Sequence, residues 1–161
     1  MSNLKKENYL QILFILSILI LSSALIIEYG FGYQPCNLCK IERIPYGLAI
    51  LILVLNYIFR KDQSFYCVLL ILIFSFSIII SVYHFGIEQG LIEESKVCAS
   101  KNLNLLTKED VLNSLKELNI SCKDVAFRIF GLSLTTYNIF TSIIMLFISI
   151  KIFKLNNAIK K

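Results

Sequence analysis

The chain has 161 residues, of which 57% are hydrophobic and 17% are charged, and its formal net charge is +5. A soluble domain of this length usually carries about a quarter charged residues. With a mean hydropathy of +0.72, the composition excludes an ordinary soluble protein. The apolar residues fall into long blocks, which a soluble core does not explain, so the chain is predicted to be an integral membrane protein.

Four apolar blocks predict four membrane-spanning helices in one membrane domain, residues 1–161. The blocks are Tyr9–Ile27, Ile44–Phe59, Phe65–Tyr83 and Leu132–Ile150. Crossing the hydrocarbon core takes about 20 helical residues, and tilt or local thinning accommodates shorter spans. The second block is short and contains Pro45. No ten-residue segment alternates with the period of an outer-membrane barrel strand. The expected fold class is all-α, a four-helix transmembrane bundle.

The positions of Lys and Arg predict the orientation. The two termini and the segment Arg60–Ser64 carry eight basic and two acidic residues, whereas Glu28–Arg43 and His84–Arg128 carry eight basic and nine acidic. By the positive-inside rule both termini are expected in the cytoplasm, with periplasmic loops at about 28–43 and 84–131 of a multi-pass inner-membrane protein. The net charge is thus an orientation signal, and no nucleic-acid partner is expected.

The first apolar block is expected to be a retained helix and not a removed leader. It is long for a signal peptide, and no small-residue cleavage site follows its apolar stretch. In the second outer loop, Thr107–Asp110 resembles a capping box and predicts a short periplasmic helix that ends at about Asn119. Its apolar stripe is compatible with packing on the bundle or with lying on the membrane surface.

The predicted topology places two cysteines in each outer loop and the fifth in the third apolar block. Cys36 and Cys39 lie in the first outer loop, and Cys98 and Cys122 in the second. Four thiols on the oxidising side of a bacterial membrane are expected to pair. Cys67 lies near the cytoplasmic end of the third block, where it is expected to be a small apolar packing residue.

Cys36 and Cys39 form a C-x-x-C motif, for which a redox dithiol is the favoured interpretation. A structural metal site needs further Cys or His ligands, and His84 is the one histidine, so no metal is expected. Attachment of a c-type haem needs His directly after the second cysteine, and position 40 is Lys. Closely spaced cysteines at a helix start have a lowered thiol pKa, and the thiolate attacks disulfides.

Twenty-three residues separate Cys98 from Cys122, and this spacing leaves two interpretations open. One is a structural disulfide that closes the loop. The other is a mobile relay disulfide that exchanges with partner thiols and then with Cys36 and Cys39.

Three polar residues are candidates for binding an electron acceptor. Arg43 follows Cys39 by four residues, so in a helix its guanidinium would share a face with the sulfur and stabilise a thiolate or a reduced, anionic ring. Pro45 complicates this geometry, because it favours a kink or a helix start. His84 and Glu88 end the third block at the same depth and could deliver protons. The alternative for Arg43 is interaction with lipid headgroups, and the alternative for His84 and Glu88 is that they are simply interfacial polar residues.

Each disulfide made leaves two electrons on the enzyme, and those electrons need an acceptor. The sequence has no haem, flavin or nucleotide motif. A lipid-soluble quinone is the simplest two-electron acceptor at the membrane boundary. The sequence does not distinguish ubiquinone from menaquinone.

Several segments resemble the disulfide bond formation protein B (DsbB) family. Cys36–Pro45 is similar to its C-x-x-C-x-x-x-R signature, and Tyr83–Glu88 and Phe130–Leu134 are similar to further segments. The resemblance covers essentially the whole chain, including four spans and two cysteine pairs. The segment between Cys98 and Cys122 follows no pattern that can be matched.

The resemblance implies a mechanism. Cys98–Cys122 would take electrons from a soluble periplasmic thioredoxin-like oxidant of the DsbA type, with Cys98 forming the mixed disulfide. Exchange would pass the electrons to Cys36–Cys39 and from there to the quinone pool of the respiratory chain. Cys39 would meet the quinone as a thiolate, and Arg43, assisted by His84, would hold the quinone.

Three other functions remain as alternatives. A vitamin K epoxide reductase-like enzyme has similar chemistry, but its C-x-x-C usually lies in a late helix and not at the start of the second. A non-enzymatic membrane scaffold would leave Cys36–Cys39 unexplained, because a short-loop bridge constrains little of the unfolded chain. A metal-transport subunit would bind metal at the C-x-x-C.

Overall fold

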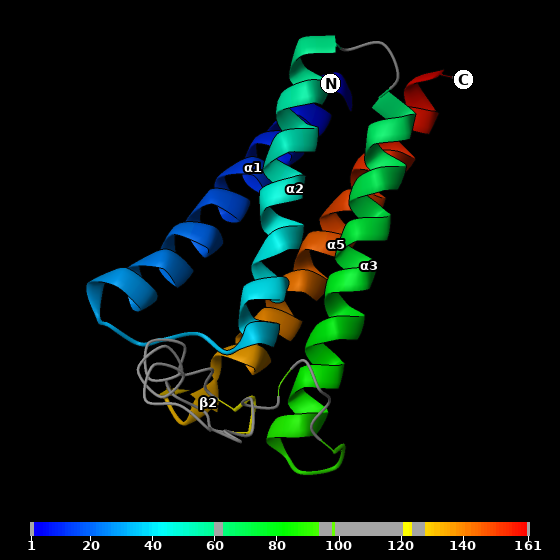
Figure 1. The fold of residues 1–161 in the computed structure, drawn as a ribbon. Coiled ribbons are helices and arrows are strands. Elements are labelled where there is room, and N and C mark those ends of the chain that lie inside the picture. The colour runs from blue at the N-terminus through cyan, green and yellow to red at the C-terminus, as the bar shows by residue number, and fades with distance from the viewer. Residues whose placement is uncertain (1, 60–62, 94–97, 99–120, 124–127, 161) are drawn as a thin grey trace, which may run out of the picture.

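Four α-helices run side by side through the part of the chain that the computed structural model describes, residues 2–59, 63–93, 98, 121–123 and 128–160. The helices are α1 (Ser2–Leu25), α2 (Asn37–Phe59), α3 (Gln63–Glu88) and α5 (Leu134–Lys160), and a π-helical turn, η1 (Ile26–Gly30), continues α1. The start of α1 and the end of α5 lie at one end of the bundle, and the start of α2 and the end of α3 lie at the other (Figure 1). The predicted helical class is therefore confirmed.

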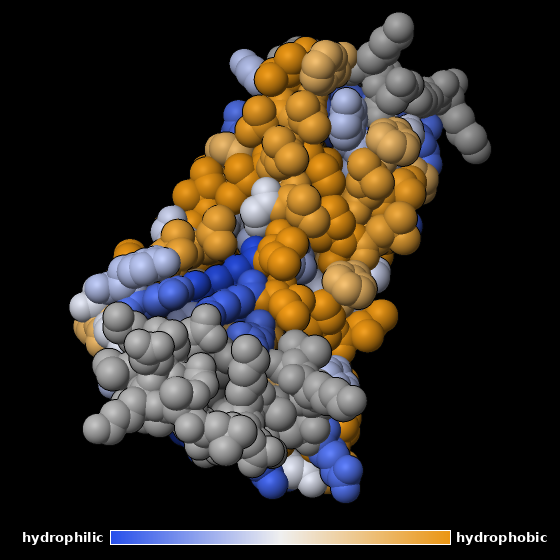
Figure 2. Space-filling view, viewed as in Figure 1, coloured by the Kyte–Doolittle hydropathy of each residue, from blue (hydrophilic) through white to orange (hydrophobic). Residues whose placement is uncertain are grey.

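Three of these helices are long and apolar enough to cross a membrane. The candidate spans are Lys6–Gly30, Gln63–Glu88 and Leu134–Ala158. Hydrophobic residues cover much of the visible surface along the helices (Figure 2), as lipid contact requires. The chain is accordingly a multi-pass membrane protein. A span by α2 remains a prediction, and the predicted periplasmic helix at 107–119 falls outside the described residues.

The helices are longer than the apolar blocks that predicted them. α1 begins seven residues before Tyr9, α3 continues past Tyr83 to Glu88, and α5 continues past Ile150 to Lys160. Hydropathy marks the part of a helix that contacts lipid, whereas backbone hydrogen bonding continues through the polar residues at both ends. His84 and Glu88 are therefore helical residues and do not belong to the predicted loop.

α2 requires the largest correction. It begins at Asn37 and not at Ile44, so seven residues of the predicted loop 28–43 are helical, and Pro45 lies inside the helix. Proline removes one N–H bond and crowds the carbonyl of Ile41, but the helix continues through it. Because of this early start, Cys39 and Arg43 lie on one helix, as their spacing requires for a shared face.

A two-stranded hairpin precedes α5. β1 (Arg128–Ile129) pairs antiparallel with β2 (Leu132–Ser133), and Ile129 is opposite Leu132. The two turn residues, Phe130 and Gly131, have φ values of 49° and 81°, the positive values that a two-residue hairpin turn needs. This hairpin corrects the expected start of the last helix from Leu132 to Leu134, since the preceding residues pair as strands.

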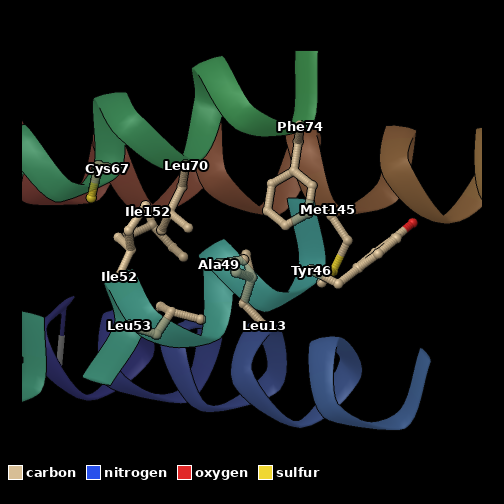
Figure 3. Packing of buried hydrophobic residues seen from close by; sticks show 10 residues of the cluster. All are labelled: Leu13, Tyr46, Ala49, Ile52, Leu53, Cys67, Leu70, Phe74, Met145 and Ile152. Atoms are coloured by element: carbon tan, nitrogen blue, oxygen red, sulfur yellow. The ribbon is translucent and has the colours of Figure 1, made fainter. Parts of the chain in front are cut away.

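A hydrophobic cluster joins the four helices (Figure 3). α2 contributes Tyr46, Ala49, Ile52 and Leu53, which recur at helical spacing and face the other helices. The remaining buried members of the cluster are Leu13, Cys67, Leu70, Phe74, Met145 and Ile152. Cys67 is thus a buried packing residue, in line with its predicted role.

A buried polar layer lies between this core and the cysteine end. The hydroxyl of Tyr46 lies 2.5 Å from Asn138 Oδ1 and 3.1 Å from Ser142 Oγ, and Ser142 is 2.9 Å from Ser77 Oγ. Asn138 also donates to Ser81 Oγ at 2.7 Å. These bonds connect α2, α3 and α5 where water cannot satisfy the side chains.

We predict that Tyr46→Phe lowers the free energy of unfolding by about 0.5–2 kcal/mol. The substitution removes the hydrogen bonds between the Tyr46 hydroxyl and its buried partners Asn138 and Ser142, while it keeps the ring. Thermal unfolding in detergent, followed by circular dichroism, measures the change. Tyr29→Phe, which removes a hydroxyl from a side chain that is 79% exposed, is the matched control. Equal unfolding temperatures for both variants would contradict the role assigned to this layer.

Candidate active site

A cavity of about 340 Å³ lies at the cysteine end of the bundle, lined by residues of α1, η1, α2, α3 and α5. α1 and η1 contribute an apolar wall that includes Ile20, Leu21 and Ile27. The lining also includes ionisable and thiol side chains. They are Cys36, Cys39, Glu42, Arg43, His84 and Glu88. In Figure 2 a hydrophilic strip interrupts the apolar surface near this end of the molecule. The site is therefore amphipathic, as small-molecule sites usually are.

The C-x-x-C motif forms the first turn of α2. The carbonyl of Cys36 accepts from Lys40 N at 3.2 Å, and Cys39 N donates to Cys36 Sγ at 3.1 Å. Cys36 thus caps the helix with its sulfur, where the positive end of the helix dipole favours a negative charge. Cys36 is buried, Cys39 is half-buried, and both are free thiols. The two cysteines of the motif therefore have different environments.

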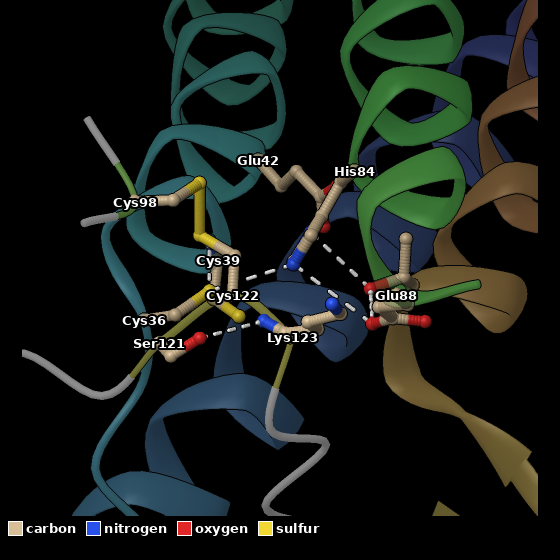
Figure 4. The surroundings of a disulfide bond; sticks show 10 residues. Cys36, Cys39, Glu42, His84, Glu88, Cys98, Ser121, Cys122 and Lys123 are labelled. Carbon is tan, nitrogen blue, oxygen red and sulfur yellow. Dashed lines mark hydrogen bonds and ion pairs between the residues drawn. A yellow bond between two sulfur atoms is a disulfide. The ribbon is translucent and has the colours of Figure 1, made fainter. Parts of the chain in front are cut away.

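His84 connects the first cysteine to a carboxylate. Its Nε2 lies 3.6 Å from Cys36 Sγ, and its Nδ1 lies 3.0 Å from Glu42 Oε1 (Figure 4). The imidazole is 1% exposed. An ionised Glu42 can only accept a hydrogen bond; in that state Nδ1–H is the donor to Glu42, and Nε2 faces the sulfur of Cys36.

These contacts favour the thiolate form of Cys36. Hydrogen bonding from the Cys39 side chain lowers the pKa of Cys36 most, and hydrogen bonding and charge from His84 lower it further. Together they outweigh the opposing effect of burial and bring the pKa of Cys36 to about 5. The contacts that stabilise a thiolate thus converge on Cys36, whereas the family resemblance assigned the thiolate to Cys39.

Thr135 joins Glu88 to the same network. Its hydroxyl donates to Glu88 Oε1 at 2.5 Å, and its oxygen lies 3.2 Å from His84 Nδ1. Glu88 Oε1 is also 3.8 Å from His84 Nε2. Glu88 Oε2 is buried and has no hydrogen-bond partner among the described residues. A buried carboxylate oxygen of this kind can accept a proton or a hydrogen bond from a ligand in the cavity.

Arg43 is held in place by an ion pair across two helices. Its Nη1 contacts Glu28 Oε2 of η1, and both side chains are 20% exposed. The guanidinium lines the same cavity as Cys39. With five donors, it has further N–H groups to offer besides the one bound to Glu28.

The second cysteine pair lies against the first. Cys98 and Cys122 form a disulfide with a Cα–Cα distance of 5.3 Å. Both pack with Cys36, Leu38 and Ile87 in one buried cluster, and Cys122 also lines the cavity. Figure 4 shows this disulfide beside Cys36 and Cys39. Two pairs that are distant in sequence are therefore brought together.

The structure brings together all seven residues that the sequence suggested, and it adds others. Glu42, Glu28 and Thr135 were missed. Glu42 carries a recognisable signal, because an ionisable residue beside an apolar block usually has a functional partner. Glu28 and Thr135 carry none, since their roles depend on how η1 and α5 pack.

Comparisons with known proteins identify the family of the chain. The family model for disulfide bond formation protein DsbB matches residues 6–152. The chain belongs to the DsbB family. An uncharacterized protein of Rickettsia prowazekii (strain Madrid E) is 33% identical over 151 residues, which cover 89% of this chain and 87% of the relative. No solved structure matches the chain. Membership of the DsbB family makes this a membrane oxidoreductase of disulfide bond formation.

We predict that the reduced protein retains one thiolate at pH values where ordinary cysteines are protonated. Because the pKa of Cys36 is lowered to about 5, ultraviolet thiolate absorbance should persist from pH 8 to 6 and disappear as the pH falls through about 5. An ordinary cysteine titrates near about 8.5.

Cys36→Ser should remove this absorbance, and His84→Phe should move its midpoint to a higher pH because one stabilising contact is lost. Cys67→Ala is the control and should leave the midpoint unchanged. A midpoint above about 8 in the unaltered protein would contradict the assignment.

Proposed function

We propose that the protein reoxidises a periplasmic thioredoxin-like disulfide donor of the DsbA type and passes the electrons to a membrane quinone. The observation that carries this proposal is that two cysteine pairs pack in one buried cluster beside an amphipathic cavity. One pair is a disulfide and the other a dithiol, so the site contains both partners of an exchange reaction. The DsbB match favours this function over that of a vitamin K epoxide reductase-like enzyme.

The proposed electron transfer balances in three steps. The dithiol of the soluble partner attacks Cys98–Cys122, through a mixed disulfide at Cys98, and leaves as a disulfide. The two new thiols then reduce a Cys36–Cys39 disulfide and restore the bond between Cys98 and Cys122. Finally, Cys36 and Cys39 lose two electrons and two protons and become a disulfide again. The pairing in the structure corresponds to the stage between the second and third steps.

The cavity fits a quinone head group. Its volume lies at the lower end of the range for small-molecule sites, and its α1 wall is apolar. Arg43 offers N–H donors to the carbonyl oxygens of a quinone, and the unpartnered Glu88 Oε2 could accept from a hydroxyl of the reduced quinol. A quinone would supply the capacity to take up two electrons and two protons. Cys39, Arg43, His84 and Glu88 are the polar residues of the lining that we assign to holding it.

The residues around the dithiol have separate tasks in this proposal. Cys39 is the less buried of the two cysteines and lines the cavity, while Cys36 is held as a thiolate against His84. His84 passes the proton that it shares with Cys36, and Glu42 keeps the imidazole in the required orientation. Arg43 attracts the negative charge that builds up on the acceptor, and Glu28 positions Arg43.

The arrangement of the helices supports the proposed topology. α1 ends beside the cysteine loops and α3 begins at the opposite end (Figure 1), so α2 connects the two ends of the bundle and would form the fourth span. Both termini lie at the end away from the cysteines. We assign that end to the cytoplasm from the excess of basic residues there, which places the site at the periplasmic face of the inner membrane.

The test is quinone reduction by the purified protein supplied with a reduced thioredoxin-like donor. Ubiquinone and menaquinone are tried separately. The unaltered chain should turn over, and Cys39→Ala should abolish turnover because the last step then lacks a disulfide-forming partner. No reduction of either quinone by folded protein would contradict the proposal and favour a structural role for both cysteine pairs.

Arg43→Gln should raise the KM for quinone by about tenfold or more, since a charge-assisted hydrogen bond contributes about 1.5–3 kcal/mol. Arg128→Gln, at an exposed position of β1, is the matched control and should leave the KM unchanged. Similar KM values for both variants would show that Arg43 does not hold the quinone.

A further inference from the structure

We propose that the reduced Cys36–Cys39 pair and His84 form a site for a thiophilic divalent cation such as Zn²⁺, which the oxidised pair cannot bind. The sequence predicted no metal site, because the one histidine, His84, is far from the C-x-x-C motif along the chain. Folding places the imidazole against the dithiol. The regulatory consequence rests on the proposed function, but metal binding itself does not.

The geometry of the three donors suits a tetrahedral ion. The two Sγ atoms and a ring nitrogen of His84 all lie within 4.8 Å of one another. Zinc bonds of about 2.3 Å to sulfur and about 2.0 Å to nitrogen, at a tetrahedral angle, place those two atoms about 3.5 Å apart. The distance from Cys36 Sγ to His84 Nε2 is 3.6 Å. An ion could thus bind with little movement of these two side chains.

The surroundings of His84 resemble the usual environment of a metal-bound histidine. A ligating imidazole almost always donates its other N–H to a carboxylate or carbonyl, which fixes the tautomer and makes the ligand more basic. Glu42 Oε1, 3.0 Å from Nδ1, already provides this contact. Nε2 is left facing Cys36 Sγ. The imidazole is therefore oriented for metal binding before an ion arrives.

A fourth coordination position also has a suitable neighbour. Glu88 Oε1 lies 3.8 Å from His84 Nε2, and the buried Oε2 has no hydrogen-bond partner among the residues described. A water molecule on the ion could donate to this oxygen. Two thiolates would neutralise the charge of the ion, so the occupied site could stay buried at low electrostatic cost.

Binding transfers protons but no electrons. The ion replaces the proton shared by Cys36 and His84 and displaces the thiol proton of Cys39, so two protons are released for each ion bound. Disulfide formation between Cys36 and Cys39 would consume both thiolate ligands. The ion therefore binds only the reduced enzyme and opposes its reoxidation, which makes the site a point of inhibition.

The test is titration of the full chain with Co²⁺, a spectroscopic probe for Zn²⁺, in detergent and after reduction by a phosphine. Cys67→Ala/Cys98→Ser/Cys122→Ser is the variant used, because the other thiols could also bind metal. One equivalent of Co²⁺ should produce tetrahedral d–d bands and thiolate charge-transfer absorbance. The unaltered chain, fully reduced and titrated in parallel, covers the case that the triple variant does not fold.

Three comparisons decide the result. Oxidation to the Cys36–Cys39 disulfide should abolish binding. Glu42→Gln should weaken binding by about 10–100-fold, the usual effect of losing a partner of a ligand. His84→Phe should weaken it more than Glu42→Gln does in both backgrounds. Absence of the tetrahedral spectrum, or affinity unaffected by His84→Phe, would overturn the proposal.

Failure of this proposal and failure of the proposed function can be told apart. The titration contains neither quinone nor a soluble partner, so a positive spectrum would stand even if quinone reduction failed. If quinone reduction succeeds, added Zn²⁺ should slow it, and a chelator should restore the rate. Unchanged turnover at Zn²⁺ concentrations that saturate the reduced site would overturn the inhibitory role.

Discussion

The buried imidazole of His84 is the constraint on which the rest of the site depends. Both ring nitrogens are removed from water, so each needs a partner, and the partners are Glu42 and Cys36 at the start of α2. Thr135 at the start of α5 lies against the same ring. These contacts fix how α2, α3 and α5 meet at one end of the bundle, and they set the environment of the Cys36 sulfur.

The apolar core and the cavity occupy different parts of the bundle along its length. Apolar side chains pack around Leu70 and Phe74, and the polar layer around Tyr46 joins the helices next to the site. α1 leans away from α2 toward the cysteine end (Figure 1), where the cavity is found. The apolar lining contributed by α1 would suit the approach of a lipid-soluble molecule from the membrane, as the proposed function requires.

Much of the fold and part of the site could be predicted from sequence. Hydropathy predicted the helical segments because lipid contact imposes apolar residues, and the spacing of Cys39 and Arg43 predicted a shared face. The start of α2 was misplaced because polar residues continue the helix, and a proline within it suggested a boundary. Glu28 and Thr135 could not be found, since they reach the site only through tertiary packing. The likeness to DsbB, first suggested by short motifs, is confirmed by the match over residues 6–152.

The central claim is that Cys36 and Cys39 are the thiols that reduce the quinone. A single-turnover experiment tests it directly: the protein with Cys98–Cys122 intact and Cys36 and Cys39 reduced is mixed with one equivalent of quinone. Quinol and free thiols are then counted, and mass spectrometry maps the disulfides. We expect the loss of two thiols for each quinol formed and a new disulfide bond between Cys36 and Cys39. Quinol formed while those thiols remain free would contradict it.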